Sequence, residues 1–215
     1  DKIYAQSELD KERLKSLGAG EIEVVGNMKA AFLPSVSKIY EKPKARVIVL
    51  ASTHAGEEDM ILGNLNLKEN DLLIIAPRHP ERFADVEKIA SEYAKKHDFS
   101  FAKFSQTYKF EAKINLLDTL GELVNVYAIS DIVVLGGSFV PNIGGHNPIE
   151  CAQFNPVIIS GEFIFNQNAL FGLVENIYIA KASDISGIID SDAKKSKIAV
   201  QASADAIIED IRSTL

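Results

Sequence analysis

The feature that most constrains this chain is a series of short, continuous apolar runs separated by amphipathic stretches. The strands of a parallel sheet are buried on both faces, so they are apolar throughout instead of alternating with polar residues. Strands that alternate with helices form βαβ units with right-handed crossovers. The sequence therefore predicts an α/β fold with a Rossmann-like, doubly wound parallel sheet. The predicted strands are 22–25, 46–51, 72–76, 99–104, 114–117, 131–135, 156–160 and 176–180.

Helices are predicted between these strands from apolar residues at helical spacing. The clearest one begins at Pro80, a residue that suits the first turn of a helix. Its apolar stripe runs from Val86 to Ala94, and it ends near His97. Further helices are predicted at 57–65, 120–130, 147–154 and 193–212.

The first 42 residues differ in character from the rest of the chain. They contain a short charged helix, predicted at 10–17, and residues 37–44 form a linker with lysine and proline. We interpret 1–42 as the remnant of an N-terminal domain with an interdomain linker, and 43–215 as one Rossmann-like domain. A frayed N-terminal extension is the alternative. The chain begins with Asp1 and not with methionine, so we interpret it as a fragment or a processed form.

Composition narrows the classes of function. The 215 residues are 47% hydrophobic and 25% charged, which is ordinary for a globular protein with a sizeable core. A net charge of −7 argues against a nucleic-acid partner, whose binding surface would need a basic stripe. The single cysteine, Cys151, excludes an internal disulfide and a thiolate metal cluster. No apolar run is long enough to span a bilayer, so we expect the fragment to be soluble.

Polar segments, three of which contain glycine, follow four of the predicted strands. In open α/β sheets, ligands bind beyond the carboxyl ends of the strands, near the point where the strand order reverses. These segments therefore predict a ligand-binding edge of the sheet. They are residues 51–58, 77–83, 118–123 and 136–150.

The last of these segments is the most informative. Gly136 and Gly137, followed by Ser138, would let backbone approach a ligand closely. Gly144 and Gly145 precede a predicted helix whose free N–H groups and dipole favour a phosphate. A tight strand-to-helix turn that merely requires glycine is the alternative.

The start of that helix carries two polar side chains. Asn147 is expected to cap it, with Pro148 in its first turn, and Glu150 could accept hydrogen bonds from ribose hydroxyls. The segment is neither a Walker sequence nor a GxGxxG fingerprint, so neither a kinase nor an ordinary dehydrogenase is predicted.

Charged residues on two other segments complete the predicted edge. Arg78 offers a planar fork of donors to a carboxylate or a phosphate. An ion pair with a nearby glutamate is the alternative for this side chain. Glu57 and Glu58 are expected in the first turn of a helix, where the dipole favours carboxylates. Thr119 and Glu122 match a capping box.

Three histidines, His54, His79 and His146, also fall on this edge. Each comes from a separate loop, and the chain has no HExxH or similar paired spacing. We therefore predict no metal site.

Taken together, these segments closely resemble the Kdo transferases, which add 3-deoxy-D-manno-octulosonic acid (Kdo) to the lipid A precursor in lipopolysaccharide assembly. The resemblance covers nearly the whole chain, in the order of the family. It rests on GNMK at 26–29, ASTH at 51–54, PRHPERF at 77–83, DTLGEL at 118–123, GGS at 136–138 and GGHNPIE at 144–150.

The resemblance implies the C-terminal half of a GT-B glycosyltransferase, which binds the nucleotide sugar CMP-Kdo and needs neither a cofactor nor a metal. The transfer would invert the anomeric carbon. The general base, most of the acceptor surface for the lipid A precursor and the membrane anchor would belong to the N-terminal domain. No catalytic residue is therefore expected in this chain, and the fragment alone is expected to be inactive. The full-length protein would lie on the cytoplasmic face of the bacterial inner membrane.

The resemblance also implies which residues bind the donor. Arg78, with His79 near it, would face the anionic groups of the donor. Ser52 and Thr53 would line the mouth of the site, while Asn27 and Lys29 would lie near the interdomain cleft. The CMP moiety would be held by Gly136, Gly137, Ser138, Gly144, Gly145, Asn147 and Glu150.

The chain departs from the family at two places. Ala30–Ala31–Phe32 stand where the family has an aromatic residue and an aspartate, and Cys151 stands where it often has proline. Two alternatives stay open: a GT-B domain of another transferase or epimerase that uses a UDP-sugar, and a non-catalytic module that binds a nucleotide sugar.

Overall fold

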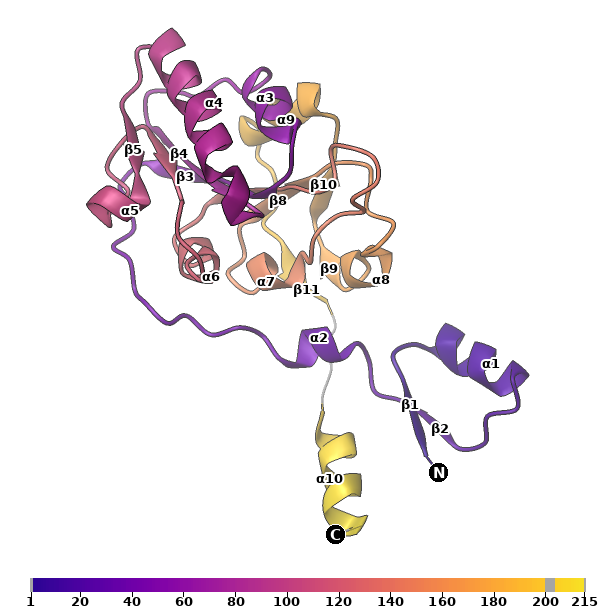
Figure 1. Cartoon of the computed structure of the whole chain (residues 1–215). Helices are drawn as coiled ribbons and strands as arrows, with labels where there is room; N and C mark the ends of the chain where they lie inside the picture. The colour runs from indigo at the N-terminus through magenta and orange to yellow at the C-terminus, as the bar shows by residue number, and fades with distance from the viewer. Residues whose placement is uncertain (1, 200–203, 215) are drawn as a thin grey trace.

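The main body of the protein is a seven-stranded parallel sheet, shown in a computed structural model that describes residues 2–199 and 204–214 (Figure 1). The strand order is β10-β8-β7-β3-β4-β6-β5. The Rossmann-like fold predicted from the apolar runs is confirmed. The strands are β3 (Arg46–Thr53), β4 (Asp71–Pro77), β5 (Phe101–Lys103), β6 (Ile114–Leu116), β7 (Ile132–Leu135), β8 (Val157–Ser160) and β10 (Ile177–Ile179).

The sheet is apolar on both faces because each face is covered by helices. Along β3, Val47 and Val49 pack into one core, and Ile48 and Leu50 into the other. Alternate residues of a strand point to opposite faces, so a strand with two buried faces must be apolar at every position. This requirement explains the unbroken apolar runs in the sequence.

Helices divide between the two faces (Figure 1). One face is covered by α3 (Glu57–Leu62), α4 (Phe83–Lys96) and α9 (Ile185–Ile189). The other is covered by α5 (Phe104–Thr107), α6 (Leu123–Tyr127), α7 (Ile149–Ala152) and α8 (Asn168–Phe171).

The clearest predicted helix is confirmed, and others are shorter than predicted. It starts as a 3₁₀ turn, Pro80–Arg82, and continues as α4, whose Val86, Ala90 and Ala94 are buried as the apolar stripe predicts. The predicted helix 193–212 is wrong in its first half. Lys197–Ile198 form strand β11, which pairs with β9 (Val174–Glu175), and helix α10 is Asp205–Thr214. Positions 200–203 of that prediction lie outside the described residues.

The chain passes from β3 through β4, β5 and β6 on one side of the sheet. It then returns to β7, next to β3, and continues through β8 to β10 on the other side. The strand order therefore reverses between β3 and β7. The loops after these two strands leave in opposite directions, which opens a space at the carboxyl edge of the sheet.

The N-terminal residues form a small unit of their own. Strand β1 (Ile3–Ala5), helix α1 (Glu8–Ser16) and strand β2 (Ile22–Val24) make a βαβ unit in which β1 and β2 form a two-stranded parallel sheet. The predicted strand 22–25 therefore exists, but it does not join the main sheet. Helix α2 (Met28–Ala31) follows, and a connector without helix or strand (residues 32–45) leads to β3.

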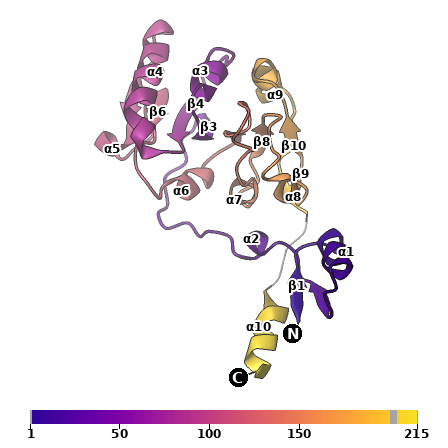
Figure 2. The ribbon, with the colours of Figure 1, turned by 45° about the vertical axis from the view of Figure 1, so that its right-hand side comes forward.

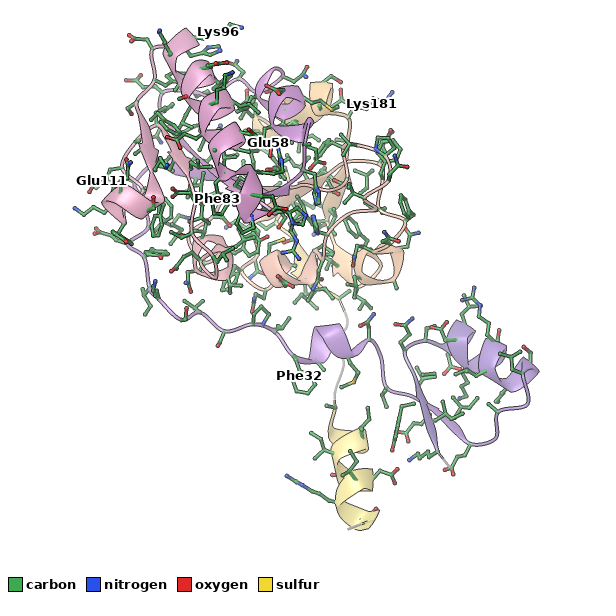
Figure 3. All side chains as sticks on the ribbon, viewed as in Figure 1. Phe32, Glu58, Phe83, Lys96, Glu111 and Lys181 are labelled. Atoms are coloured by element: carbon green, nitrogen blue, oxygen red, sulfur yellow. The ribbon has the colours of Figure 1, made fainter. Side chains whose placement is uncertain are left out.

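Helix α10 lies with the N-terminal unit and not on the sheet (Figures 1 and 2). The hydroxyl of Tyr4 donates a hydrogen bond to Asp210 Oδ2 at 2.8 Å. Phe32 follows α2 at the start of the connector (Figure 3), and its side chain is 67% exposed. The division of the chain between residues 42 and 43 stays a prediction, but the sheet with its covering helices ends before α10.

No helix within residues 2–199 and 204–214 combines the length and the apolar character that crossing a membrane requires.

Substituting Gly161 tests how closely the loops after β7 and β8 pack. A Cβ at Gly161 would lie 2.1 Å from the carbonyl oxygen of Ser138, and backbone cannot move aside as a flexible side chain can. We expect Gly161→Ala to lower the free energy of unfolding by about 1–3 kcal/mol, as overpacking does. Circular dichroism during heating would show a melting temperature several degrees lower.

Gly187→Ala is the matched control, because a Cβ there meets no atom within 4 Å. The control should leave the melting temperature unchanged or raise it slightly, since alanine restricts the unfolded chain. Equal melting temperatures for the two variants would contradict the described packing at Gly161.

Candidate functional site

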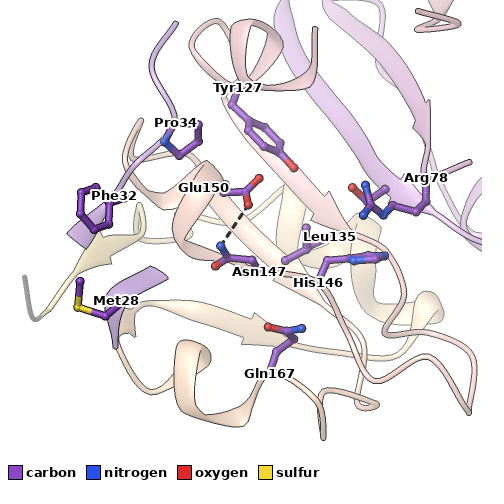
Figure 4. Close-up of a pocket in the computed structure, with 11 residues that line it drawn as sticks. Met28, Phe32, Pro34, Arg78, Tyr127, Leu135, His146, Asn147, Glu150 and Gln167 are labelled. Atoms are coloured by element: carbon purple, nitrogen blue, oxygen red, sulfur yellow. Dashed lines mark hydrogen bonds between the residues drawn. The ribbon is translucent and has the colours of Figure 1, made fainter. Parts of the chain in front are cut away.

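A pocket of about 580 Å³ lies at the carboxyl ends of β3 and β7, where the strand order reverses (Figure 4). We call it the switch-point pocket. Its volume lies in the range of pockets that bind small molecules. It is lined by Met28, Phe32, Pro34, Ser52, Arg78, Tyr127, Leu135, His146, Asn147, Glu150 and Gln167. A second pocket of about 100 Å³ shares Ser52 and Arg78 with it and extends toward Gly121.

Ser52 enters the pocket because β3 is irregular at its end. The register between β3 and β4 shifts between Ala51 and Thr53, and Ser52 has a positive φ of 55°. An irregularity of this kind re-aims a side chain at the end of a strand. The structure thus brings Ser52 to the predicted site. Thr53 is not brought there, because it is buried and its Oγ1 donates to Glu58 Oε1 at 2.6 Å.

Arg78 supplies the positive charge of the pocket. It leaves β4 at its carboxyl end, is exposed, and points toward the pocket from the side opposite Asn147 (Figure 4). Within the described ranges, no carboxylate lies within ion-pair distance of its guanidinium. The predicted alternative, an ion pair with a nearby glutamate, is therefore wrong. An unpaired guanidinium at the edge of a pocket is available to an anionic ligand.

Two of the expected ligand-binding residues meet on the opposite wall. Asn147 Nδ2 donates to Glu150 Oε1 at 3.2 Å (Figure 4), and Asn147 Oδ1 accepts the backbone N–H of Ile149 at 3.0 Å. These bonds fix the Asn147 side chain and tie it to the Glu150 carboxylate. The buried Tyr127 directs its hydroxyl into the pocket (Figure 4). Burial raises the pKa of Tyr127 well above its ordinary value, so the hydroxyl stays protonated.

A pair of stacked histidines borders the pocket. The Nε2 atoms of His54 and His146 lie 2.8 Å apart, and the ring centroids are separated by 5.1 Å. Such a contact requires one nitrogen to donate and the other to accept, so at least one ring is neutral. Burial, together with the charges of His54 and Arg78, lowers the pKa of His146 to about 4, and burial also lowers the pKa of His54. In the part of the chain that the structure describes, no three His, Cys, Asp or Glu residues are placed to hold a metal.

The resemblance assigns Gly136, Gly137, Ser138 and Gly145 to the CMP moiety, but their backbone amides already have partners inside the protein. The amide of Gly137 donates to Glu57 Oε2 at 2.7 Å, and that of Ser138 donates to Glu57 Oε1 at 3.0 Å. The amide of Gly136 bonds to Ala51 O, and that of Gly145 to Gly137 O, both at 2.8 Å. These N–H groups are used inside the protein. Ser138 is fully buried, and its hydroxyl donates to Leu135 O.

These glycines leave room for the side chains and loops that form the pocket wall. Gly137 has a φ of +70°, and a Cβ there would lie 2.7 Å from the His146 ring. Any side chain at this position would displace the imidazole from the pocket wall. Gly144 is buried, and its carbonyl accepts the amide of Asn166 at 3.1 Å.

The predicted phosphate-binding helix terminus is also wrong. Helix α7 is a single turn of four residues, so it has little dipole. Its first amide, that of Ile149, is already bonded to Asn147. The predicted capping box does not form either, because Thr119 Oγ1 has no partner among the described residues.

Two other expected site residues, His79 and Asn27, lie outside the pocket lining. His79 is exposed and packs edge-on against His54, with Nδ1 3.8 Å from Glu81 Oε1. Asn27 Nδ2 donates to Gln6 Oε1 at 3.1 Å, whereas its neighbour Met28 lines the pocket. The side chain of Lys29 lies outside the described residues.

An ion pair that the sequence did not predict, between Glu58 and Arg82, stabilises the edge of the pocket at the end of β3. Glu58 is fully buried, and its two oxygens accept from Arg82 Nη1 and Nη2 at 2.6 and 2.9 Å. Arg82 Nη1 also donates to Thr53 O. This pair joins the end of β3 to the start of the helix after β4. Its only sequence signal was a glutamate and an arginine on two segments predicted to meet at one edge.

Helix α2 and the connector supply three further pocket residues that the sequence did not predict. Met28, Phe32 and Pro34 form one wall of the pocket (Figure 4). The connector is held by Glu122, whose carboxylate accepts from Lys38 Nζ and, at 2.5 Å, from Tyr40 Oη. Apolar residues in a polar linker were the available signal for this wall.

Comparison with known proteins places the chain among sugar transferases. It is similar to a bifunctional glycosyltransferase/methyltransferase of Fusobacterium nucleatum, 36% identical over 179 residues, which are 76% of this chain and 27% of that protein. It is also similar to the 3-deoxy-D-manno-octulosonic acid transferase of Haemophilus influenzae, 31% identical over 192 residues, which are 81% of this chain and 44% of that protein. The chain therefore spans less than half the length of these relatives. No protein-family model matches it.

A solved structure supports the same relationship. The C-terminal CMP-Kdo binding domain of WaaA from Acinetobacter baumannii is 30% identical to the chain and superposes with a TM-score of 0.59. The match covers 67% of this chain and 78% of that domain.

The histidine pair predicts a specific dependence of stability on pH. The unfolded chain binds a proton at His146 below its ordinary pKa of 6.5, whereas the folded chain does so only near pH 4. The contribution of His146 is therefore fully present above pH 6.5 and is lost as the pH falls toward 4. Urea unfolding at pH 8, 6 and 5 should show a smaller loss of stability with falling pH for His146→Gln than for the wild type.

At pH 8 the His146 imidazole is neutral in both states, so the difference between the proteins at that pH measures packing alone. Parallel pH profiles for the two proteins would contradict a lowered pKa of His146.

Proposed function

The chain belongs to the family of Kdo transferases, and from this membership we propose that it is the part of such a glycosyltransferase that binds the donor CMP-Kdo. The observation that carries the proposal is the unpaired guanidinium of Arg78 at the pocket located where the strand order reverses. In the GT-B architecture that we propose for the whole enzyme, this edge would face the cleft between two domains.

Arg78 is proposed to bind the anionic groups of the donor. CMP-Kdo carries a phosphate and a sugar carboxylate, and a guanidinium binds either group through two parallel hydrogen bonds. Negative charge grows on the phosphate when its bond to the anomeric carbon breaks. A fixed cation that faces this charge stabilises the transition state. We therefore propose that Arg78, and not the glycine amides, faces the phosphate of the donor.

Glu150 is proposed to bind the ribose. Its carboxylate borders the pocket and is oriented by Asn147, so it can accept hydrogen bonds from the hydroxyls of the sugar. Tyr127 adds a protonated hydroxyl on the same wall. The neutral histidine pair adds no charge near pH 7, which leaves Arg78 as the cationic group of the pocket lining.

The remaining steps are proposed to depend on the rest of the enzyme. Glu150 is the one carboxylate among the described residues that line the pocket, and the proposed role in nucleotide binding uses it. A base must still remove the proton of the acceptor hydroxyl. We propose that the N-terminal domain supplies this base, the surface for the lipid A precursor and the attachment to the cytoplasmic face of the inner membrane.

Substitution of Arg78 tests the donor pocket. We expect the chain to bind CMP, and Arg78→Ala and Glu150→Ala each to weaken binding by about 10- to 100-fold, the loss of one charged hydrogen-bonding partner. Isothermal titration calorimetry would measure the affinities. Arg13→Ala removes an exposed arginine of α1 and is the matched control.

Unchanged CMP affinity in both pocket variants would remove these residues from the site. Tighter binding of UMP than of CMP by the wild type would favour a donor of the UDP-sugar class.

The second test concerns catalysis. We expect the 215-residue chain to bind CMP but not to transfer Kdo, because the described pocket holds no carboxylate that is left to act as the base. Mass spectrometry of a lipid A precursor incubated with the chain and CMP-Kdo would detect the product. The same chain joined to its N-terminal domain is the positive control, and product formed by the chain alone would contradict the proposal.

A further inference from the structure

Glu57 holds the loops after β3 and β7 together. It is the first residue of α3 and is fully buried. Its Oε2 accepts the amides of His54 at 2.8 Å and Gly137 at 2.7 Å. Its Oε1 accepts the amides of Ser138 at 3.0 Å and Phe139 at 2.9 Å. One carboxylate thus satisfies four backbone donors from two loops.

The amides at 137–139 have the geometry of an anion-binding site. Three successive N–H groups converge on one carboxylate, with Gly137 in the left-handed conformation. Concave groups of successive amides of this kind bind phosphates in other proteins. Here the anion is a side chain of the protein itself. Within residues 2–199 and 204–214, no cationic side chain forms an ion pair with Glu57, because Arg82 pairs with Glu58.

The two loops that Glu57 joins both supply residues of the pocket. His54 lies two residues after Ser52, which lines the pocket. Gly137 accepts the amide of Gly145, which precedes His146 and Asn147. The contact between His54 and His146 closes the link between the loops from the pocket side. The positions of the loops after β3 and β7, where they border the pocket, therefore depend on one buried carboxylate.

We propose that Glu57 is a positioning residue for donor binding. Its carboxylate fills the anion site formed by the amides at 137–139 and fixes the loops after β3 and β7 at the switch-point pocket. The anionic group of the donor is thereby directed to Arg78. The inference rests on the proposed function. Glu57 is not among the residues that line the pocket, so we propose that it acts through the backbone of the two loops that it binds.

Glu57→Gln tests this role with the least change of shape. The substitution replaces one acceptor oxygen with an NH₂ group, which then faces two backbone N–H groups. We expect the amide resonances of His54, Gly137, Ser138 and Phe139 to shift in ¹H–¹⁵N spectra of the folded variant. We also expect the CMP dissociation constant to rise at least tenfold, although Arg78 and Glu150 are intact.

Asp71→Asn is the matched control. Asp71 is another buried carboxylate, which accepts from Arg46 and from the amide of Lys68, but it lies at the amino end of β4. It should lose stability in a comparable way and keep the CMP affinity of the wild type. A general effect of destabilisation would instead weaken CMP binding in both variants and overturn the proposal.

A second variant tests the anion site directly. Glu57→Ala leaves the four amides without an acceptor in a space the size of a small carboxylate. Added formate should return its CMP affinity toward that of the wild type and should not affect Asp71→Asn. Failure of formate to restore affinity, or wild-type affinity in Glu57→Gln, overturns the proposal.

The spectra separate this proposal from the proposed function. A wild-type chain that does not bind CMP contradicts the proposed function. The positioning role is then decided without ligand: it is supported if the resonances of Ser52 and His146 shift together with the four amides in Glu57→Gln, and it is overturned if those resonances stay in place.

Discussion

Burial of the central sheet on both faces is the constraint on which the rest of this structure depends. Strands β3 and β7 contact helices on both sides, so they are apolar throughout Val47–Ala51 and Ile132–Leu135. Polar groups must emerge where the strands end. Because β3 and β7 lie side by side and the chain leaves them in opposite directions, their carboxyl ends open the pocket. The location of the site thus follows from the same packing that gives the fold.

Some charged side chains at this edge, Glu57 and Glu58, are buried, whereas Arg78 is exposed. Glu57 and Glu58 are neighbours in the chain and both fully buried, yet they have different partners. Glu58 pairs with Arg82 and holds the end of β3 to the helix after β4, while Glu57 accepts four backbone amides. Since these two acids are already satisfied, Arg78 keeps an unpaired guanidinium that faces the pocket. Its availability therefore depends on the pairing of residues that do not line the pocket.

The positions of site residues along the sequence could be predicted better than their hydrogen-bond partners. Arg78, Asn147 and Glu150 were expected at the edge and are in the pocket, because each follows an apolar run that could only be a buried strand. The glycine amides were assigned the wrong partner, because a glycine pair predicts a tight turn but not the direction of its N–H groups. Glu57 was missed for a related reason, since a glutamate in a first helical turn is usually solvated.

The order of the strands along the chain, and the edge at which polar groups gather, could be predicted from the residues alone, because burial on two faces requires unbroken apolar runs. The sequence also carried the family motifs. The contacts at that edge follow from the folded arrangement. The buried carboxylate of Glu57 accepts the amides after β7, and Arg82 forms an ion pair with Glu58. The connector folds back and forms one wall of the pocket. These contacts join residues far apart in the chain, and each polar group had several possible partners of equal chemistry. Their choice depends on distance and direction in the folded protein, which no local pattern contains.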